Sequence, residues 1–342
     1  MSYADQIFKK NGRDILENGT STEGQEVRPH WHDGTPAYTI KHFGVADTFD
    51  LQKEFPAVTS RKTGIKSCWD EILWIFQRKS NNIHDLRPHI WDDWADEEGS
   101  IKKAYGYQIG KVSRFKVLKK VEEAKKYFDR IKEMKLPSAY IEVSVNSYSN
   151  KYRIMDINET GEDFFNDCTE DENTEYNIWM DQMDAVLYQL KYEPFSRRIL
   201  TTLWNPEELT EMGLQPCCWS VTFNVTDEKR ADGKLTLNML LNQRSNDMLA
   251  AYNWNTCQYA LLLMAVAQVS GMVAGKLLHV IVDQHIYDRH IDIMKELLER
   301  PEYPAPKVWL DSDITNFYDF TYDSIHVEDY VTGEQVSFEV AV

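Results

Sequence analysis

Residues 219–241, WSVTFNVTDEKRADGKLTLNMLL, contain two runs in which apolar and polar side chains alternate. The apolar positions are Trp219, Val221, Phe223 and Val225 in the first run, and Leu235, Leu237, Met239 and Leu241 in the second. A period of two is typical of a strand with one buried face, and the Ala-Asp-Gly sequence between the runs favours a turn. The segment therefore predicts an antiparallel hairpin that is half-buried.

The sequence after this hairpin adds a helix, a strand and a second helix. Residues 256–272 are apolar on nearly every face, which predicts a helix buried at the centre of the domain. Residues 277–282 predict a strand, followed by a helix that runs to Leu298 and by short strands toward Val342. This mixed order predicts the α+β class, a mainly antiparallel sheet packed with helices. The chain has neither a GxGxxG nor a Walker pattern, so it implies neither a dinucleotide-binding nor a P-loop fold.

Composition and charge limit what kind of protein this is. Of the 342 residues 42% are hydrophobic, and the net charge of −17 argues against binding to nucleic acid or to an anionic membrane. The longest apolar run, residues 260–267, is shorter than a membrane span, and the N-terminal residues do not look like a secretory signal. The five cysteines include no CxxC pair, so we expect neither a disulfide framework nor a zinc ribbon. We therefore expect a cytoplasmic protein.

Residues 111–177 differ in character from the rest and are predicted to be an insertion in a single domain of residues 1–342. Apolar residues at three- and four-residue steps predict an amphipathic helix that Pro137 ends. These residues are Val117, Val121, Ala124, Phe128 and Ile131. Residues 140–145 predict a strand, and the acidic run at 156–175 predicts a solvated loop.

Cys217 is the strongest candidate for a reactive group. It lies in Pro216-Cys217-Cys218, between a helical segment and the first strand of the hairpin, where a thiol can face a cleft. Arg197, Arg198 and Arg244 flank it in the sequence, and guanidinium groups both bind phosphate and lower the pKa of a nearby thiol. The alternatives are a buried cysteine that only packs and arginines that only form surface ion pairs.

Four further side chains are candidates for a polar site. Glu71 lies in the apolar segment WDEILW, where it either is buried, with a raised pKa suited to proton transfer, or faces solvent. Asn255 either caps the buried helix or binds the edge of a pyrimidine. An amide suits the second role, because it donates to one atom and accepts from the next. His285 and Tyr287 follow a strand and either bind sugar hydroxyls or are structural. No histidine has a carboxylate or cysteine at a matching spacing, so no metal site is predicted.

Short blocks along most of the chain resemble the thymidylate synthase family. They occur in order and leave out only about 111–177. They are DGTP at 33–36, FPAVT at 55–59, EILW at 71–74, IWDDW at 90–94, AYG at 104–106, SRR at 196–198, WNPEEL at 204–209, PC at 216–217, QRSND at 243–247, Asn255, DQHIY at 283–287, FYDF at 317–320 and VAV at 340–342.

The resemblance implies an obligate homodimer, joined through its sheet faces, that converts dUMP to dTMP. It implies that 5,10-methylenetetrahydrofolate supplies the one-carbon unit and the hydride, that the Cys217 thiolate adds to C6 of uracil, and that Glu71 relays protons. The implied dUMP contacts are Gln243, Arg244, Ser245, Asp247, Asn255, His285 and Tyr287, with Arg197 and Arg198 coming from the other subunit.

The resemblance also implies where the folate lies. It would stack near Ile90, Trp91 and Trp94, touch Asp247, and be covered by the C-terminal residues, which include Ala341. Such closure excludes water and favours a methyl product. The alternative is a dUMP hydroxymethylase, which has the same covalent cysteine step but adds water in place of the hydride.

Several positions depart from the usual pattern of the family, including the following. Cys218 stands where a histidine is common, directly after the implied nucleophile. His32 and Asp33 stand in the region where the family usually supplies a further phosphate-binding arginine, which leaves Arg28 as the candidate substitute.

Overall fold

A six-stranded sheet forms the centre of the computed structural model, which describes residues 1–145, 148–153, 173–228 and 230–342. The strand order is β1-β2-β10-β9-β8-β7. The strands are β1 (Thr20–Ser21), β2 (Thr39–Asp50), β7 (Leu200–Thr202), β8 (Cys218–Thr226), β9 (Thr236–Asp247) and β10 (Val273–Tyr287). Neighbouring strands are antiparallel except for β9 and β10, which are parallel. The predicted α+β class with a mainly antiparallel sheet is confirmed.

Strands β8 and β9 are the predicted hairpin. Their buried face consists of the pairs Val221–Leu241, Phe223–Met239 and Val225–Leu237, all at most 7% exposed. Thr222 and Asn224, which alternate with these residues, are half-buried and exposed. Because successive side chains of a strand point to opposite faces, one side of the sheet belongs to the core and the other does not.

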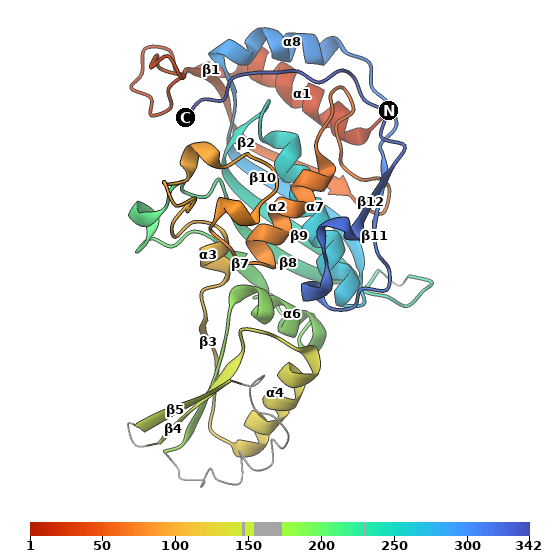
Figure 1. Ribbon diagram of the computed structural model, residues 1–342. Coiled ribbons are helices and arrows are strands. Elements are labelled where there is room, and N and C mark those ends of the chain that lie inside the picture. Colours follow the sequence, from red (N-terminus) through yellow and green to blue (C-terminus); the bar gives the residue numbers. More distant parts are fainter. Residues whose placement is uncertain (146–147, 154–172, 229) are drawn as a thin grey trace.

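Helices cover the core side of the sheet. Helix α7 (Tyr252–Val269) packs on β9 and β10, and helix α2 (Ile65–Phe76) packs on α7 (Figure 1). Helix α1 (Tyr3–Asn18) crosses β2 and β10 and packs on α8 (Ile291–Glu299), near both chain ends in Figure 1. Among the described helices, none has both the length and the apolar character that crossing a membrane requires.

The predicted buried helix begins earlier than expected. Helix α7 starts at Tyr252, so Asn255 lies inside its first turn and the alternative that Asn255 caps the helix is wrong. The predicted strand at 277–282 is the middle of the longer β10, and the predicted helix to Leu298 is α8. Of the short strands expected after it, β11 (Lys307–Leu310) and β12 (Ile325–Glu328) form a two-stranded sheet. The 3-10 helices are Ile83–Asp85, Asp92–Trp94, Leu209–Glu211, Asp288–His290, Phe317–Asp319 and Tyr322–Ser324.

A second sheet, with the order β3-β6-β4-β5, extends away from the main sheet together with helix α4 (Figure 1). Its elements are β3 (Ser113–Leu118), α4 (Val121–Met134), β4 (Tyr140–Val145), β5 (Tyr148–Arg153) and β6 (Glu175–Met180). The strand predicted at 140–145 is confirmed as β4. The assignment of Val117 to the helix is wrong, because it lies in β3 and is 42% exposed. Of the predicted acidic loop, residues 156–172 lie outside the described residues, and Glu175 begins β6.

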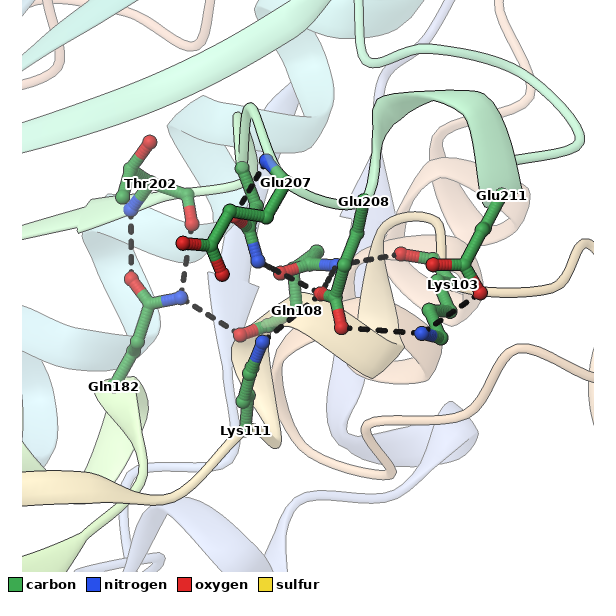
Figure 2. A network of polar contacts seen from close by, with 9 residues as sticks. Lys103, Gln108, Lys111, Gln182, Thr202, Glu207, Glu208 and Glu211 are labelled. Carbon is green, nitrogen blue, oxygen red and sulfur yellow. Dashed lines mark hydrogen bonds and ion pairs between the residues drawn. The ribbon is translucent and has the colours of Figure 1, made fainter.

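The two sheets are joined by a polar network around Glu208 (Figure 2). Its carboxylate accepts hydrogen bonds from Nε2 of Gln108 in helix α3 (Gly106–Ile109) at 2.9 Å and from Nζ of Lys111 at 3.0 Å. These bonds hold the pKa of Glu208 at about 2. Gln182, at the start of helix α6 (Gln182–Tyr192), donates to the carbonyl oxygens of Gln108 and Thr202 at 2.7 and 2.8 Å. The network therefore fixes strand β7 and the segment that leads toward Cys217 against the connections that enter the second sheet before β3 and leave it after β6.

Candidate active site

Most of the predicted site residues meet at one end of the main sheet. Cys218, the first residue of β8, pairs with Gln243 of β9. Strands β9 and β10 are parallel, so they end at the same edge, where Ser245 lies beside Asp283 and Asp247 beside His285. The topology thus brings together residues 217, 243–247 and 283–287, which are far apart in the sequence.

Cys217 is a partly exposed, free cysteine at this edge. Its Sγ lies 3.8 Å from Nη2 of Arg244, which also donates to the carbonyl oxygen of Gln215 at 2.9 Å. Burial raises the pKa of the thiol, while Arg244 and Arg28 act in the opposite direction. Of the three arginines predicted to lower the thiol pKa, Arg244 does so in this chain, but burial outweighs it, and the thiol is the resting form at neutral pH.

Glu71 is buried in helix α2, with 5% of its surface exposed, so the alternative that it faces solvent is wrong. Its Oε1 accepts a hydrogen bond from Nε1 of Trp91 at 2.8 Å, and its Oε2 accepts one from Nε1 of Trp254 at 2.6 Å. Burial raises the pKa of Glu71 to about 7, against the lowering effect of the two indole donors. A carboxyl group with this pKa can both donate and accept a proton at neutral pH.

Aromatic side chains connect the cysteine to the buried acid. The backbone N–H of Cys217 donates to the hydroxyl oxygen of Tyr105 at 3.3 Å, and the Tyr105 ring lies 4.7 Å from that of Trp91. The ring of Trp94 is 5.7 Å from Trp91, and Ile90 is half-buried beside it in the sequence. The predicted folate-stacking residues therefore form an aromatic wall next to Glu71.

Asn255 is held by two other amides. Its Oδ1 accepts a hydrogen bond from Nε2 of Gln243 at 3.0 Å, and its Nδ2 donates to Oε1 of Gln258 at 2.9 Å. Asn255 follows Trp254, the donor to Glu71, so the amide and the acid are tied to one turn of helix α7.

His285 and Tyr287 end strand β10 beside Asp247. His285 is 7% exposed, with Nδ1 2.8 Å from Oδ1 of Asp283, and its ring lies 5.1 Å from that of Tyr287. Oδ1 of Asp247 accepts from the backbone N–H groups of Leu249 and Ala250 at 2.8 and 3.2 Å, which stabilises the turn into helix α7.

The remaining two predicted parts of the site differ in where they lie. Arg197 and Arg198 are exposed between α6 and β7, and in the described part of the chain neither guanidinium contacts another predicted site residue. The C-terminal tail, which includes the half-buried Ala341, lies beside the site, because the carbonyl oxygen of Glu339 is 2.8 Å from Nε2 of His290, whose Nδ1 is 3.8 Å from Asp247. The backbone of Val342 exchanges hydrogen bonds of 2.8 and 3.0 Å with that of His30.

Four residues for which the sequence predicts no role also contact predicted site residues: Tyr105, Trp254, His279 and Asp283. Tyr105 and Asp283 lie within blocks of the resemblance, and Trp254 precedes Asn255, so proximity in the sequence was a signal for these three. Within the described residues, no three His, Cys, Asp or Glu side chains converge as a metal site requires.

Comparison with known proteins gives one consistent result. The chain matches the family profile described as thymidylate synthase over residues 6–342. It is 36% identical to thymidylate synthase of Bacillus licheniformis and 34% identical to thymidylate synthase 1 of Bacillus subtilis, each over 346 residues covering 100% of both chains. Among solved structures it is similar to thermostable thymidylate synthase A from Bacillus subtilis, with a TM-score of 0.75, 34% identity and 100% of each chain covered. The chain therefore belongs to the thymidylate synthase family, and it is a methyltransferase.

Proposed function

We propose that this methyltransferase converts dUMP to dTMP, with 5,10-methylenetetrahydrofolate as co-substrate and dihydrofolate as the second product. One observation carries the proposal. A thiol beside an arginine, a buried acid with a pKa of about 7 and an amide with free hydrogen-bonding capacity are joined by a continuous series of contacts at one sheet edge. These are the groups needed to add to a pyrimidine, to move protons on it and to identify its edge.

Cys217 is the proposed nucleophile. Its Sγ bonds to C6 of uracil, its proton leaves to solvent, and the electron pair of the C5–C6 double bond moves toward C5 and O4. C5 thereby becomes reactive toward the one-carbon unit, bonds to it and loses its proton. When the hydride arrives on the new carbon, the C5–C6 double bond is restored as the S–C6 bond breaks, and the sulfur leaves as thiolate. The guanidinium of Arg244, 3.8 Å from Sγ, favours the thiolate that this addition requires.

Glu71 is the proposed proton relay to the O4 side of the pyrimidine, through water. Its two indole donors support this role because they hold the carboxyl group in one orientation, and its pKa of about 7, set by burial against the lowering effect of these donors, allows both protonation states at neutral pH.

The remaining residues at the sheet edge are proposed to bind dUMP. Arg244 and Ser245, with Arg28 and the Arg197 and Arg198 of a second subunit, would bind the phosphate. Asn255 would bind the pyrimidine, while His285 and Tyr287 would bind the sugar hydroxyl. Gln243 and Asp247 would complete the site by holding Asn255 and the turn before helix α7.

The aromatic wall of Trp91 and Trp94, with Ile90, fits a flat pterin, and the acid beside it fits a co-substrate that must lose and gain protons. When bound, 5,10-methylenetetrahydrofolate supplies the one-carbon unit and the hydride. Asp247 and the C-terminal residues around Ala341 would limit its access to water.

The outer side of the main sheet supports the proposed homodimer. Leu240 and Leu278 pair across β9 and β10 and are only half-buried, and Val282 is 48% exposed. A second copy would cover this face and bring its Arg197 and Arg198 to the site. We further infer a single domain of residues 1–342 with an insertion at 111–177, and a reducing, cytoplasmic setting, in which the free cysteines of the described ranges would persist.

The test is incubation with 5-fluoro-dUMP and 5,10-methylenetetrahydrofolate, followed by proteolysis and mass spectrometry. The proposal expects a stable adduct of both compounds on the peptide that contains Cys217, and none in Cys217→Ser. With dUMP itself, the product should have the mass of dTMP. A product heavier by one oxygen, with tetrahydrofolate left unoxidised, would contradict the proposed reaction.

A further inference from the structure

Behind Asn255 lies a row of polar side chains that is closed off from solvent. His279, Gln243 and Gln258 are 0%, 1% and 2% exposed. Nε2 of His279 lies 2.7 Å from Oε1 of Gln243, and Nε2 of Gln243 lies 3.0 Å from Oδ1 of Asn255. Nδ2 of Asn255 then donates to Oε1 of Gln258 at 2.9 Å. One hydrogen-bonded row thus runs from strand β10 through β9 to helix α7.

The orientation of Gln243 in this row follows from its contact with a backbone carbonyl, and the orientation of Asn255 follows from that of Gln243. Nε2 of Gln243 lies 2.9 Å from the carbonyl oxygen of Ser245, which can only accept. The nitrogen of Gln243 must therefore face Ser245 and Asn255, and its oxygen must face His279. His279 consequently carries its proton on Nε2, and Asn255 turns its oxygen toward Gln243.

The shortest contact of the ring, 2.7 Å between Nε2 and Oε1 of Gln243, decides the tautomer, because the Thr256 hydroxyl beside Nδ1 also donates to the carbonyl oxygen of Tyr252 at 2.8 Å. Burial lowers the pKa of His279 to about 3, so the imidazole is neutral at physiological pH. Its ring stacks on Tyr252, with centroids 5.9 Å apart, and Nδ1 is 3.2 Å from the hydroxyl oxygen of Thr256. The Nε2–H of His279 is therefore the donor that fixes the oxygen of Gln243.

The row is fixed at Gln243, by His279 and by the carbonyl oxygen of Ser245, and not at Gln258. In the described part of the chain, Nε2 of Gln258 is buried and has no hydrogen-bond partner, so Gln258 does not oppose inversion of Asn255. If Gln243 inverted, its oxygen would face the carbonyl of Ser245 and the oxygen of Asn255. Asn255 and Gln258 could then invert with it, because each amide presents a donor and an acceptor of similar shape.

The orientation of Asn255 determines which pyrimidine it can bind. Held as described, its amide retains one lone pair on Oδ1 and one hydrogen on Nδ2 for a ligand. This pair complements the N3–H donor and the O4 acceptor of uracil. Cytosine presents an acceptor at N3 and a donor at N4, which would require the inverted amide.

We propose that His279 is a positioning residue that strengthens the specificity of the site for uracil over cytosine, because together with the carbonyl oxygen of Ser245 it holds Gln243, and through it Asn255, in one orientation. This inference rests on the proposed function, in which a pyrimidine nucleotide binds at Asn255. His279 does not touch the nucleotide and acts only through the two amides.

The test compares His279→Gln with His279→Met, since the two side chains have similar size and only Gln can donate to Gln243. Dissociation constants for dUMP and dCMP are measured for each variant and for the parent. We expect the dCMP/dUMP ratio of dissociation constants to fall about tenfold in His279→Met and to stay within about twofold of the parent in His279→Gln. Tyr252→Phe is the control, because it keeps the ring beside His279 but removes the hydroxyl that donates to Asp47, and its ratio should equal that of the parent.

Equal ratios in the Gln and Met variants would overturn the proposal. If neither variant folds, nitrogen-15 NMR of histidine in the parent protein provides the test. A neutral Nε2–H tautomer of His279 is expected, and an Nδ1–H tautomer would overturn the proposal. Failure of the proposed function is distinguishable, because then the parent protein itself would not bind dUMP.

Discussion

Trp254 donates its indole N–H to Oε2 of Glu71 at 2.6 Å, across the contact between helices α7 and α2. The next residue of α7 is Asn255, so a single side chain fixes the buried acid relative to the amide that is proposed to bind the pyrimidine. Any movement of α7 against α2 would displace both groups together. Proton transfer and pyrimidine binding therefore share one structural support.

Replacing Glu71 with glutamine should stabilise the protein more at pH 8 than at pH 5. The pKa of Glu71 is about 7 in the folded protein and 4.5 without the influence of the fold, so the unfolded chain loses this proton at lower pH. Ionisation of Glu71 therefore lowers the free energy of unfolding as the pH rises from 4.5 to 7, in total by about 3 kcal/mol. Glutamine does not ionise, so the variant does not lose this stability. Urea denaturation of both proteins at pH 5 and pH 8 measures the difference. A difference that does not change with pH would show that Glu71 has an ordinary pKa.

Trp254→Phe should shift the pH dependence of the reaction upward. The indole N–H stabilises the ionised carboxylate and lowers its pKa, so its loss should raise the pKa of Glu71 above about 7. One limb of the pH profile of kcat/KM for dUMP reflects ionisation of Glu71. This limb should shift to higher pH by up to about one pH unit. Trp309→Phe is the matched control, since Trp309 is 40% exposed on β11, and it should leave the profile unchanged. An unmoved limb in Trp254→Phe would mean that another group titrates there.

Asp283→Asn should weaken dUMP binding through His285. The carboxylate of Asp283 lies 2.8 Å from Nδ1 of His285 and fixes the proton there, which leaves Nε2 as an acceptor for the sugar hydroxyl. An asparagine can hold the ring in either tautomer, so KM for dUMP should rise about three- to tenfold. KM for the analogue that lacks the 3′-hydroxyl should not change, which separates this effect from a general disturbance. Lys41→Met removes only the exposed partner of Asp283 and should change KM less than twofold.

The parts of the fold that sequence patterns predicted are those in which one face is buried and the other is not. Strands β8, β9 and β4 alternate clearly for this reason, and helix α7 is apolar all round because it lies between the sheet and α2. Strand β10 pairs in parallel with β9, so it joins residues that are distant in the sequence. A local pattern of apolar residues cannot predict this pairing or the full length of β10. The helical assignment of Val117 is wrong because its spacing continues the helical period of α4, although the chain pairs with β6 at that point.

The site residues that could be predicted are those whose residue type itself indicates a chemical role. Cys217, Glu71 and Asn255 were identified as candidates, and the structure places them around a common set of contacts. The roles of Trp254 and His279 depend on contacts between helices and between strands. An indole or an imidazole in a core segment is usually a packing residue, so its sequence position alone cannot show that it supports a site.

Two inactive variants should restore activity to each other if the site is shared between subunits. Cys217→Ser lacks the nucleophile but keeps the exposed Arg197 and Arg198, whereas a chain with both arginines changed to glutamate keeps Cys217. In a mixed dimer, one of the two sites receives Cys217 from one chain and both arginines from the other. Random association makes half of the dimers mixed, each with one complete site, so the mixture should reach about a quarter of the parent activity.

The assay is dTMP formation after the two chains are denatured together and refolded, with each chain refolded alone as its reference. Mixing Cys217→Ser with Cys217→Ala should restore nothing, because neither chain supplies a thiol. If the arginine variant alone is fully active, the two guanidinium groups do not bind the phosphate. If it is inactive and the mixture is inactive as well, each site is built from one chain, and the exposed position of Arg197 and Arg198 has another cause.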